Sequence, residues 1–229
     1  KKKFNKLNKS SFLIMINLCC KLIHFRIFGS ELMEEIIQLF SNLQINWSVI
    51  ETLAVLFSII YVVLAAKENI WCWVAAAISV SLYIYICFTA KLYPEAGLQI
   101  FYLLMAVFGY FMWNKENKEQ IKEWSELRHL LIILIGSIAT FFMGYYFSIY
   151  TDSQMPIVDS FTTVFSIIAT YMVTKKVLGN WLYWIVIDVV SVYLYFSRDL
   201  HLTSGLFLVY AIIAIFGYFL WIKRMKANE

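Results

Sequence analysis

Apolar residues run along the chain in seven long blocks, and short polar joints separate most of them. The blocks lie at about 50–66, 70–89, 95–113, 129–149, 158–174, 180–197 and 203–222. Each has roughly the 17 to 25 residues that an α-helix needs to cross the hydrocarbon core of a bilayer. None shows the alternation of a membrane β-barrel strand. The pattern therefore predicts an all-α integral membrane protein with seven transmembrane helices.

The second half of the chain repeats the first at a constant offset, without a gap. From Leu82 to Trp113, 12 of 32 positions are identical to their counterparts from Val190 to Trp221. The repeated motifs include Phe-Ser-Ile-Ile, at 57–60 and 165–168, and Gly-Tyr-Phe, at 109–111 and 217–219. A single block joins the two three-helix units, so both must run in the same direction across the membrane. We therefore expect a parallel 3+1+3 repeat like that of the sugar-transporting SWEET proteins, although channels and enzymes can also be duplicated.

This repeat divides the chain into four parts. Residues 49–114 form the first three-helix unit, 115–157 a polar joint with a linker helix, and 158–226 the second unit. Residues 1–48 are an extension with an amphipathic lead-in at the membrane interface. For residues 1–32 three interpretations stay open: an extra weak span at 11–28, a signal-like segment, or translation that starts at Met33. We favour the start at Met33, so that 1–32 would not be translated.

The composition is that of a membrane protein, and the distribution of Lys and Arg predicts its orientation. The chain is 62% hydrophobic, with a mean hydropathy of +0.72, whereas soluble domains are about 45 to 50% apolar. Lys and Arg gather in the joints at 66–70, 114–129 and 174–180 and at the C-terminus, whereas the opposite joints carry only Lys91 and Arg198. Because cytoplasmic loops are the ones rich in Lys and Arg, we expect a cytoplasmic C-terminus. We attribute the net charge of +4 to the Lys and Arg residues of the joints that set the membrane topology, so no nucleic-acid partner is expected.

The sixth block holds a carboxylate, Asp188, at the middle of an otherwise apolar segment. An acid at the centre of a spanning helix costs about 2.5 to 3.5 kcal/mol on insertion, so something must offset that cost. Trp181, Trp184, Asp188, Ser191 and Tyr195 are spaced 3, 4, 3 and 4, which places them on one helix face. Aromatic rings around a carboxylate suit a cationic aromatic ligand. The alternative is that Trp181 belongs to the interfacial belt and Asp188 is a buried hydrogen-bonding group.

Other candidate substrate-binding residues come from the matching face of the first unit and from the third and seventh blocks. The candidates are Trp73, Tyr83, Gln99, Tyr102, Asn180 and Tyr210. Gln99 is an unexpected amide whose counterpart, Phe207, is apolar; an interhelical hydrogen bond is its other interpretation. Tyr102 and Tyr210 could equally serve packing, and Asn180 is also a candidate helix N-cap. Trp71, Trp113 and Trp221 are expected to be interfacial anchors.

No phosphate-binding loop, nucleophile elbow, paired-acid motif or metal-ligand spacing is present in the sequence. Cys72 and Cys87 fall inside apolar blocks, and no disulfide framework follows from the cysteine positions. We therefore expect a protein that is not an enzyme and that needs no cofactor.

Over Met33 to Lys226 the chain resembles the PnuC family of vitamin-precursor transporters. The resemblance is carried by Asn-Trp-x-x-Trp-x-x-x-Asp at 180–188 and Glu-x-x-x-Gln-x-x-Tyr at 95–102. It implies a SWEET-like transporter of the bacterial inner membrane that takes up nicotinamide riboside by facilitated diffusion. It also implies a homotrimer, and a cytoplasmic kinase that traps the product.

The substrate stays open between two cations, since nicotinamide riboside carries a pyridinium and thiamine, carried by some relatives, a thiazolium. Neutral riboflavin fits a carboxylate less well. We favour nicotinamide riboside and keep a thiamine transporter as the alternative. A non-transporting small-molecule receptor with the same pocket and an ion channel are the competing classes.

Overall fold

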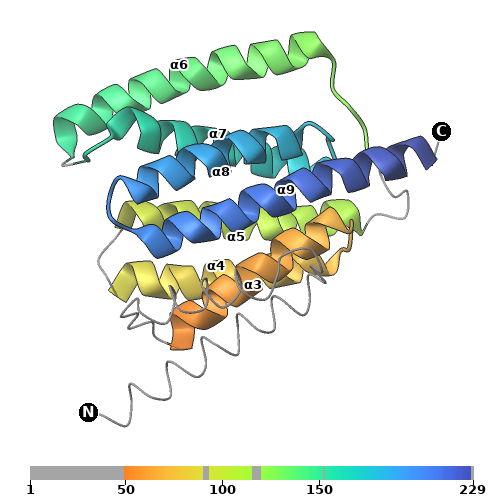
Figure 1. Cartoon of the computed structure of the whole chain (residues 1–229), viewed down its shortest axis with the longest axis horizontal. Coiled ribbons are helices and arrows are strands. Elements are labelled where there is room, and N and C mark those ends of the chain that lie inside the picture. Colours follow the sequence, from red (N-terminus) through yellow and green to blue (C-terminus); the bar gives the residue numbers. More distant parts are fainter. Residues whose placement is uncertain (1–48, 90–92, 115–119, 152, 228–229) are drawn as a thin grey trace, which may run out of the picture.

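In the computed structural model, residues 49–89, 93–114, 120–151 and 153–227 are described. They form seven helices that lie side by side along the long axis of the molecule (Figure 1). These are α3 (Val49–Ala66), α4 (Trp71–Thr89), α5 (Tyr93–Trp113), α6 (Glu126–Tyr150), α7 (Pro156–Thr174), α8 (Asn180–Phe196) and α9 (His201–Ala227). The expectations for residues 1–48, including the start at Met33 and the span at 11–28, lie outside the described residues.

The all-helical prediction is confirmed, and each apolar block corresponds to one helix. Six of the helices in the described part of the chain are long and apolar enough to cross a membrane. The seventh, α8, is apolar but has only 17 residues. Extended pairing within the described ranges is limited to an isolated bridge between Lys122 and Val177.

The helices pack as two consecutive groups of three, with α6 outside them (Figure 1). In the first group α4 contacts both α3 and α5, and in the second α8 contacts both α7 and α9. The groups meet through α3 against α9 and α5 against α7, while α6 packs on α7. One end of the bundle holds the end of α9, the joints at 66–71 and 174–180, and residues 120–126 before α6, and we call it the C-terminal face.

Four buried tryptophans link the two groups near the C-terminal face, and we call them the tryptophan cluster. Trp73 meets Trp113 edge to face at 5.4 Å between centroids, and Trp181 meets Trp221 in the same way at 5.5 Å. Trp113 and Trp221 then meet each other at 6.4 Å, so α5 and α9 are joined through their rings. The cluster forms part of the largest hydrophobic core of the described residues.

Two glycines make room for this cluster. A Cβ added at Gly109 would lie 2.5 Å from the Trp73 ring, and one at Gly217 would lie 2.8 Å from the Trp181 ring. Each glycine therefore lets a helix backbone approach an indole face directly, as small residues do where helices pack closely in membranes.

The expectation that Trp113 and Trp221 are interfacial anchors is wrong. Their exposed fractions are 5% and 0%, because the cluster contacts enclose them inside the bundle. An anchor must present its ring to the headgroup region. Trp71, with 62% of its surface exposed, is placed as an anchor requires.

An ion pair lies at the C-terminal face, beside the tryptophan cluster. Lys176 pairs with Glu68, and Arg224 lies 3.3 Å from the second Glu68 oxygen while donating to the Lys67 carbonyl at 2.6 Å. The Lys176 ammonium also lies 4.9 Å from the centroid of the Trp113 ring. Glu68 and Lys176 both have positive φ angles, 54° and 49°. The joints α3–α4 and α7–α8 thus make the same kind of turn.

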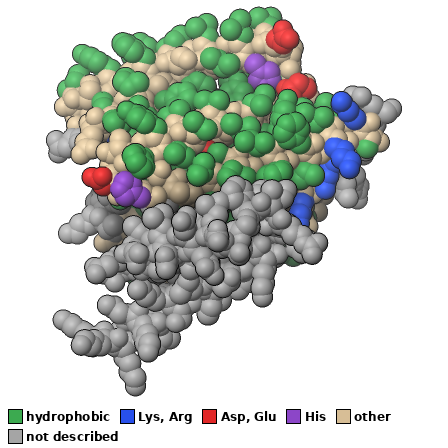
Figure 2. All heavy atoms as spheres, viewed as in Figure 1, with side chains coloured by type: hydrophobic (Ala, Val, Ile, Leu, Met, Phe, Trp, Pro, Cys, Tyr) green, Lys and Arg blue, Asp and Glu red, His purple; other side chains and the backbone are tan. Residues whose placement is uncertain are grey.

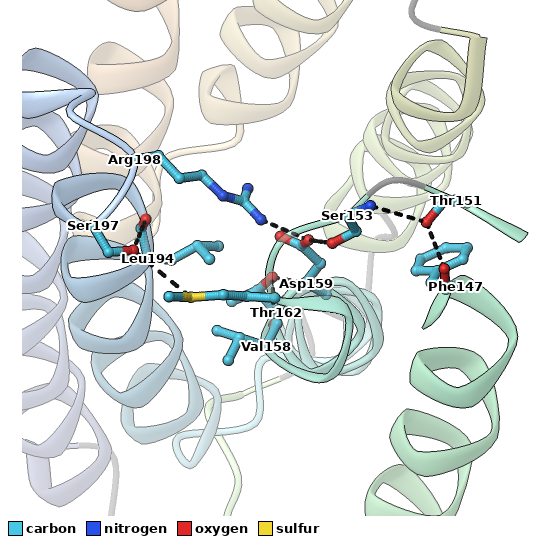
Figure 3. Close-up of polar contacts among 10 residues, drawn as sticks. Phe147, Thr151, Ser153, Val158, Asp159, Thr162, Leu194, Ser197 and Arg198 are labelled. Atoms are coloured by element: carbon cyan, nitrogen blue, oxygen red, sulfur yellow. Dashed lines mark hydrogen bonds and ion pairs between the residues drawn. The ribbon is translucent and has the colours of Figure 1, made fainter. Parts of the chain in front are cut away.

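A second polar contact ties the opposite end of the bundle together (Figure 3). Asp159, in the first turn of α7, accepts hydrogen bonds from Arg198 Nη2 at 2.7 Å and from Ser153 Oγ at 2.5 Å. Arg198 belongs to the α8–α9 joint and Ser153 to the α6–α7 joint. One carboxylate therefore connects three segments at this end.

Candidate substrate site

The α8 stripe predicted from the spacing faces the interior of the bundle. Trp181, Asp188 and Ser191 each have 2% of their surface exposed, and Trp184 and Tyr195 are half-buried. The outer side of the helix carries exposed residues, namely Leu182, Val186, Val189 and Tyr193. The amphipathic arrangement therefore turns the acid inward, where neighbouring helices rather than lipid surround it.

Asp188 is the most unusual group in this interior. Among the described residues, no hydrogen bond or ion pair engages its carboxylate. Its carboxylate lies close enough to Tyr210 on α9 for an electrostatic interaction. Burying an ionised carboxylate without a partner is costly. A cation brought to this position would offset that cost.

Tyrosines from three helices form a connected set of contacts that reaches Asp188 through Tyr210. The Tyr210 hydroxyl bonds to Ser58 on α3, and Tyr210 interacts with Tyr83 on α4 as well as with Asp188. Tyr83 in turn interacts with Tyr195 on α8. The structure thus brings together Asp188, Tyr83 and Tyr210, three of the predicted residues, with hydroxyl groups able to donate or accept hydrogen bonds.

Aromatic stacking holds two of these tyrosines in place. The Tyr195 ring stacks on Phe207 at 5.1 Å with an interplanar angle of 9°, and Phe207 meets Tyr210 edge to face at 5.8 Å. Because Phe207 touches both rings, it fixes their relative position. This explains why the counterpart of Gln99 in the second unit is aromatic.

The candidates on α5 are Tyr102 and Gln99. Tyr102 interacts with Ser166 on α7 and with Tyr195 on α8. Gln99, one turn earlier on α5, is half-buried. Trp184 contacts both hydrophobic cores of the described residues. It therefore lies between the tryptophan cluster and the α7 residues Phe161 and Phe165.

The remaining three predicted residues lie nearer the C-terminal face than Asp188. Trp73 and Trp181 belong to the tryptophan cluster, and their indole N–H groups are buried without a partner in the described structure. Asn180 is fully buried, and its amide nitrogen donates to the Val177 carbonyl at 2.6 Å while its oxygen has no partner there. The N-cap interpretation of Asn180 is wrong, because Gly179 occupies the cap position and Asn180 is the first residue of α8.

Sequence reasoning missed the two serines that face the tyrosines. Ser58 partners Tyr210 and Ser166 partners Tyr102. A signal was available, since both serines belong to the repeated Phe-Ser-Ile-Ile motif and both tyrosines are identical in the two halves. The offset of the sequence repeat therefore relates the two serine–tyrosine contacts as well as the two tryptophan–glycine contacts.

The interior thus offers one carboxylate, several hydroxyl groups and many aromatic faces. This combination binds an aromatic cation well, since the carboxylate balances its charge, the rings contact its π-system and the hydroxyls pair with polar substituents. The described residues contain no group of three His, Cys, Asp or Glu side chains placed to hold a metal ion.

Comparison with known proteins shows the family of the chain. The model of the nicotinamide mononucleotide transporter family matches residues 48–223. The chain belongs to this family. It is therefore a multi-pass membrane transporter and not an enzyme.

Three relatives illustrate the range of the family. The nicotinamide riboside transporter PnuC of Escherichia coli is 26% identical over 212 residues, which cover 80% of this chain and 87% of the relative. The riboflavin/roseoflavin transporter RibM of Streptomyces davaonensis is 22% identical over 181 residues, covering 76% and 84%. A crystal structure of the vitamin B3 transporter PnuC matches with a TM-score of 0.64 and 25% identity, covering 79% of this chain and 83% of that one.

Proposed function

We propose that this protein takes up nicotinamide riboside by facilitated diffusion and binds it in the interior lined by Asp188, Trp184, Tyr83 and Tyr210. Gln99, Tyr102, Trp73, Trp181 and Asn180 complete the proposed site. The observation that carries the proposal is the Asp188 carboxylate, which is 2% exposed and unpaired in the described residues. The pyridinium of nicotinamide riboside supplies the positive charge that this position requires.

A thiamine transporter is the second candidate, because the thiazolium ring is also an aromatic cation. The same carboxylate and the same rings would serve it. Riboflavin, named for the relative from Streptomyces, is neutral and would leave Asp188 unpaired. The charge at Asp188 therefore favours the two cations over riboflavin.

For the architecture, we propose that α8 also crosses the membrane, giving seven spans in a SWEET-like parallel 3+1+3 repeat. Its support is the recurrence of contacts at the offset of the sequence repeat. Trp73 on Gly109 matches Trp181 on Gly217, and Ser58 with Tyr210 matches Ser166 with Tyr102. The contacts between units, α3 with α9 and α7 with α5, match in the same way.

We also propose an inner-membrane location with the C-terminal face in the cytoplasm. Figure 2 shows Lys and Arg side chains gathered at the end where the C-terminus lies. Positive charge on the cytoplasmic side is the general rule for such proteins. A cytoplasmic kinase that phosphorylates the imported nucleoside would keep its free concentration in the cytoplasm low and so maintain the gradient that drives uptake. The family resemblance further suggests a homotrimer.

Binding and flux measured together test the proposed substrate. Purified protein should bind nicotinamide riboside and thiamine with different affinities, the tighter one being the substrate, and riboflavin most weakly. Sealed vesicles that contain the protein should accumulate the labelled substrate until the inside and outside concentrations are equal. Binding without flux would favour a receptor, and tightest binding of riboflavin would contradict the role given to Asp188.

A further inference from the structure

A basic pocket lies at the C-terminal face, outside the proposed substrate site. Its volume is about 360 Å³, and its lining residues are Lys122, Glu123, Trp124, Arg128, Tyr171 and Lys175. They come from the α5–α6 joint, the first turn of α6 and the last turns of α7. Three of the six lining side chains are cationic and one is acidic.

The backbone of the joint is held firmly beneath this pocket. The Lys122 N–H donates to the Lys176 carbonyl at 3.0 Å, and the Leu178 N–H donates to the Lys122 carbonyl at 2.8 Å. Ile121, the preceding residue, is buried, with 6% of its surface exposed. These contacts fix the floor of the pocket against the α7–α8 turn.

Glu123, the acidic residue of the pocket, is paired with other residues of the chain. Two of the cations, Arg128 and Lys175, have no carboxylate partner among the described residues. Glu123 Oε1 accepts from His129 Nε2 and from the Trp124 N–H, both at 2.9 Å. Arg128 lies over the Trp124 ring at 5.2 Å. Lys175 lies 5.5 Å from the Phe108 ring and 3.9 Å from Met112 Sδ. Neither cation contacts a carboxylate within the described ranges, so among these residues the two charges have no counter-ion.

The helices that line the pocket carry exposed apolar side chains. Tyr171 at its edge is 44% exposed, and Leu127, Leu130 and Leu131 on the first turns of α6 are 65%, 62% and 48% exposed. A ligand that fits both parts has an anionic head and apolar tails. Basic pockets between transmembrane helices on the cytoplasmic side bind anionic lipid headgroups in this way.

We propose that this pocket binds the phosphate headgroup of an anionic glycerophospholipid, whose acyl chains lie against the start of α6. The phosphate pairs with Arg128 and Lys175, and the aromatic rings under these cations keep them pointed at it. The orientation proposed above determines only which leaflet of the membrane supplies the lipid. The proposal does not depend on the transported substrate.

The test uses the full-length protein in a neutral detergent, with phosphatidylglycerol, phosphatidylcholine of the same chains, or inorganic phosphate added. Phosphatidylglycerol should raise the melting temperature and stay bound in native mass spectrometry, whereas phosphatidylcholine should do neither. Stabilisation by inorganic phosphate alone, equal to that by phosphatidylglycerol, would identify a free-phosphate site and overturn the lipid assignment. Equal effects of the two lipids would overturn the role of charge.

Variants locate the effect in the pocket. Each of Arg128→Gln and Lys175→Gln should weaken phosphatidylglycerol binding by about fivefold, the equivalent of about 1 kcal/mol per cation at a membrane surface. Lys223→Gln removes an exposed cation from the same face outside the pocket and should leave binding unchanged. If Lys223→Gln weakens binding equally, the attraction is unspecific and the site is excluded. The melting temperature without added lipid should stay at the parental value in all three variants, which shows that they fold.

Discussion

Lys176 and Glu68 form an ion pair although they occupy the same position in the two halves of the chain, 108 residues apart. Under the twofold repeat proposed above, a position can meet its own counterpart only on the symmetry axis. Trp113 and Trp221 are also counterparts in the repeat, and they also touch. The two contacts together therefore mark the axis at the C-terminal face.

The ion pair on this axis should stabilise the fold, and the contributions of its two residues should be coupled. Lys176 and Glu68 are largely buried, with 6% and 20% of their side chains exposed. Glu68→Gln leaves the buried Lys176 without its carboxylate, and Lys176→Met leaves Glu68 with only the 3.3 Å contact to Arg224. Each variant should therefore cost about 1 to 3 kcal/mol. The double variant should cost less than the sum, with a coupling of at least about 0.5 kcal/mol.

Unfolding midpoints of the four proteins in this cycle measure the coupling. A matched cycle on Glu68 and Lys223, which share no contact in the described structure, serves as the control and should be additive. Additive losses for Glu68 and Lys176 would mean that their pairing has no energetic weight.

Removing the charge of Asp188 should weaken substrate binding and leave the fold intact. Asp188→Asn preserves size and part of the hydrogen-bonding capacity. The loss of a charge-assisted contact should therefore cost about 1 to 3 kcal/mol of binding free energy, or about thirtyfold in affinity at the middle of that range. Calorimetric titration with nicotinamide riboside gives the affinity, and thermal unfolding reports the fold.

Ser191→Ala is the matched control, because Ser191 is equally buried one turn further along the same face of α8. It should bind as the parent does. Unchanged affinity in Asp188→Asn, together with a lowered melting temperature, would make the acid a structural group and refute its role with the cation.

The two glycines beneath the tryptophan cluster should not tolerate a side chain. Gly109→Ala and Gly217→Ala each force a methyl group to within 3 Å of an indole ring. We expect a loss of about 1 to 3 kcal/mol for each, the usual cost of overpacking. The measurement is the melting temperature of the purified protein.

Gly97→Ala provides the comparison within α5, since an added Cβ there meets nothing within 4 Å. Alanine is the better helix former by about 1 kcal/mol, so this variant should be as stable as the parent or more so. Similar losses at all three positions would show that the packing against Trp73 and Trp181 is not the cause.

Orientation is accessible to labelling with a membrane-impermeant thiol reagent, in a background whose four native cysteines are replaced by alanine. Lys226→Cys, at the C-terminal face, should react only after the membrane is opened. Asp199→Cys, whose position in the α8–α9 joint is 98% exposed, should react in intact cells. The reverse pattern would invert the proposed topology.

Periodicity and hydropathy were sufficient to predict the helices, because in a bilayer every backbone group must be satisfied within its own segment. The bounds of α7, for example, differ by two residues at one end from the predicted block at 158–174. The inward position of Asp188 followed equally well from the spacing of its neighbours on α8.

Contacts across the bundle were beyond such reasoning. Trp113 and Trp221 look like surface anchors in the sequence, since they end apolar blocks, yet they touch each other in the core. Their burial depends on which helices meet, and that is a tertiary property. The pairing of Ser58 with Tyr210 escaped notice for the same reason, although the repeat contained both residues.

The opposite charges of Glu68 and Lys176 also constrain how such a protein can be assembled from separate pieces. Two copies of the first half alone, arranged as the present halves are, would set one Glu68 against another. Two copies of the second half would oppose two ammonium groups beside the same indole rings. Each half is thus electrostatically unsuited to pair with itself and suited to the other, so the charge pair selects the mixed pairing over either homodimer.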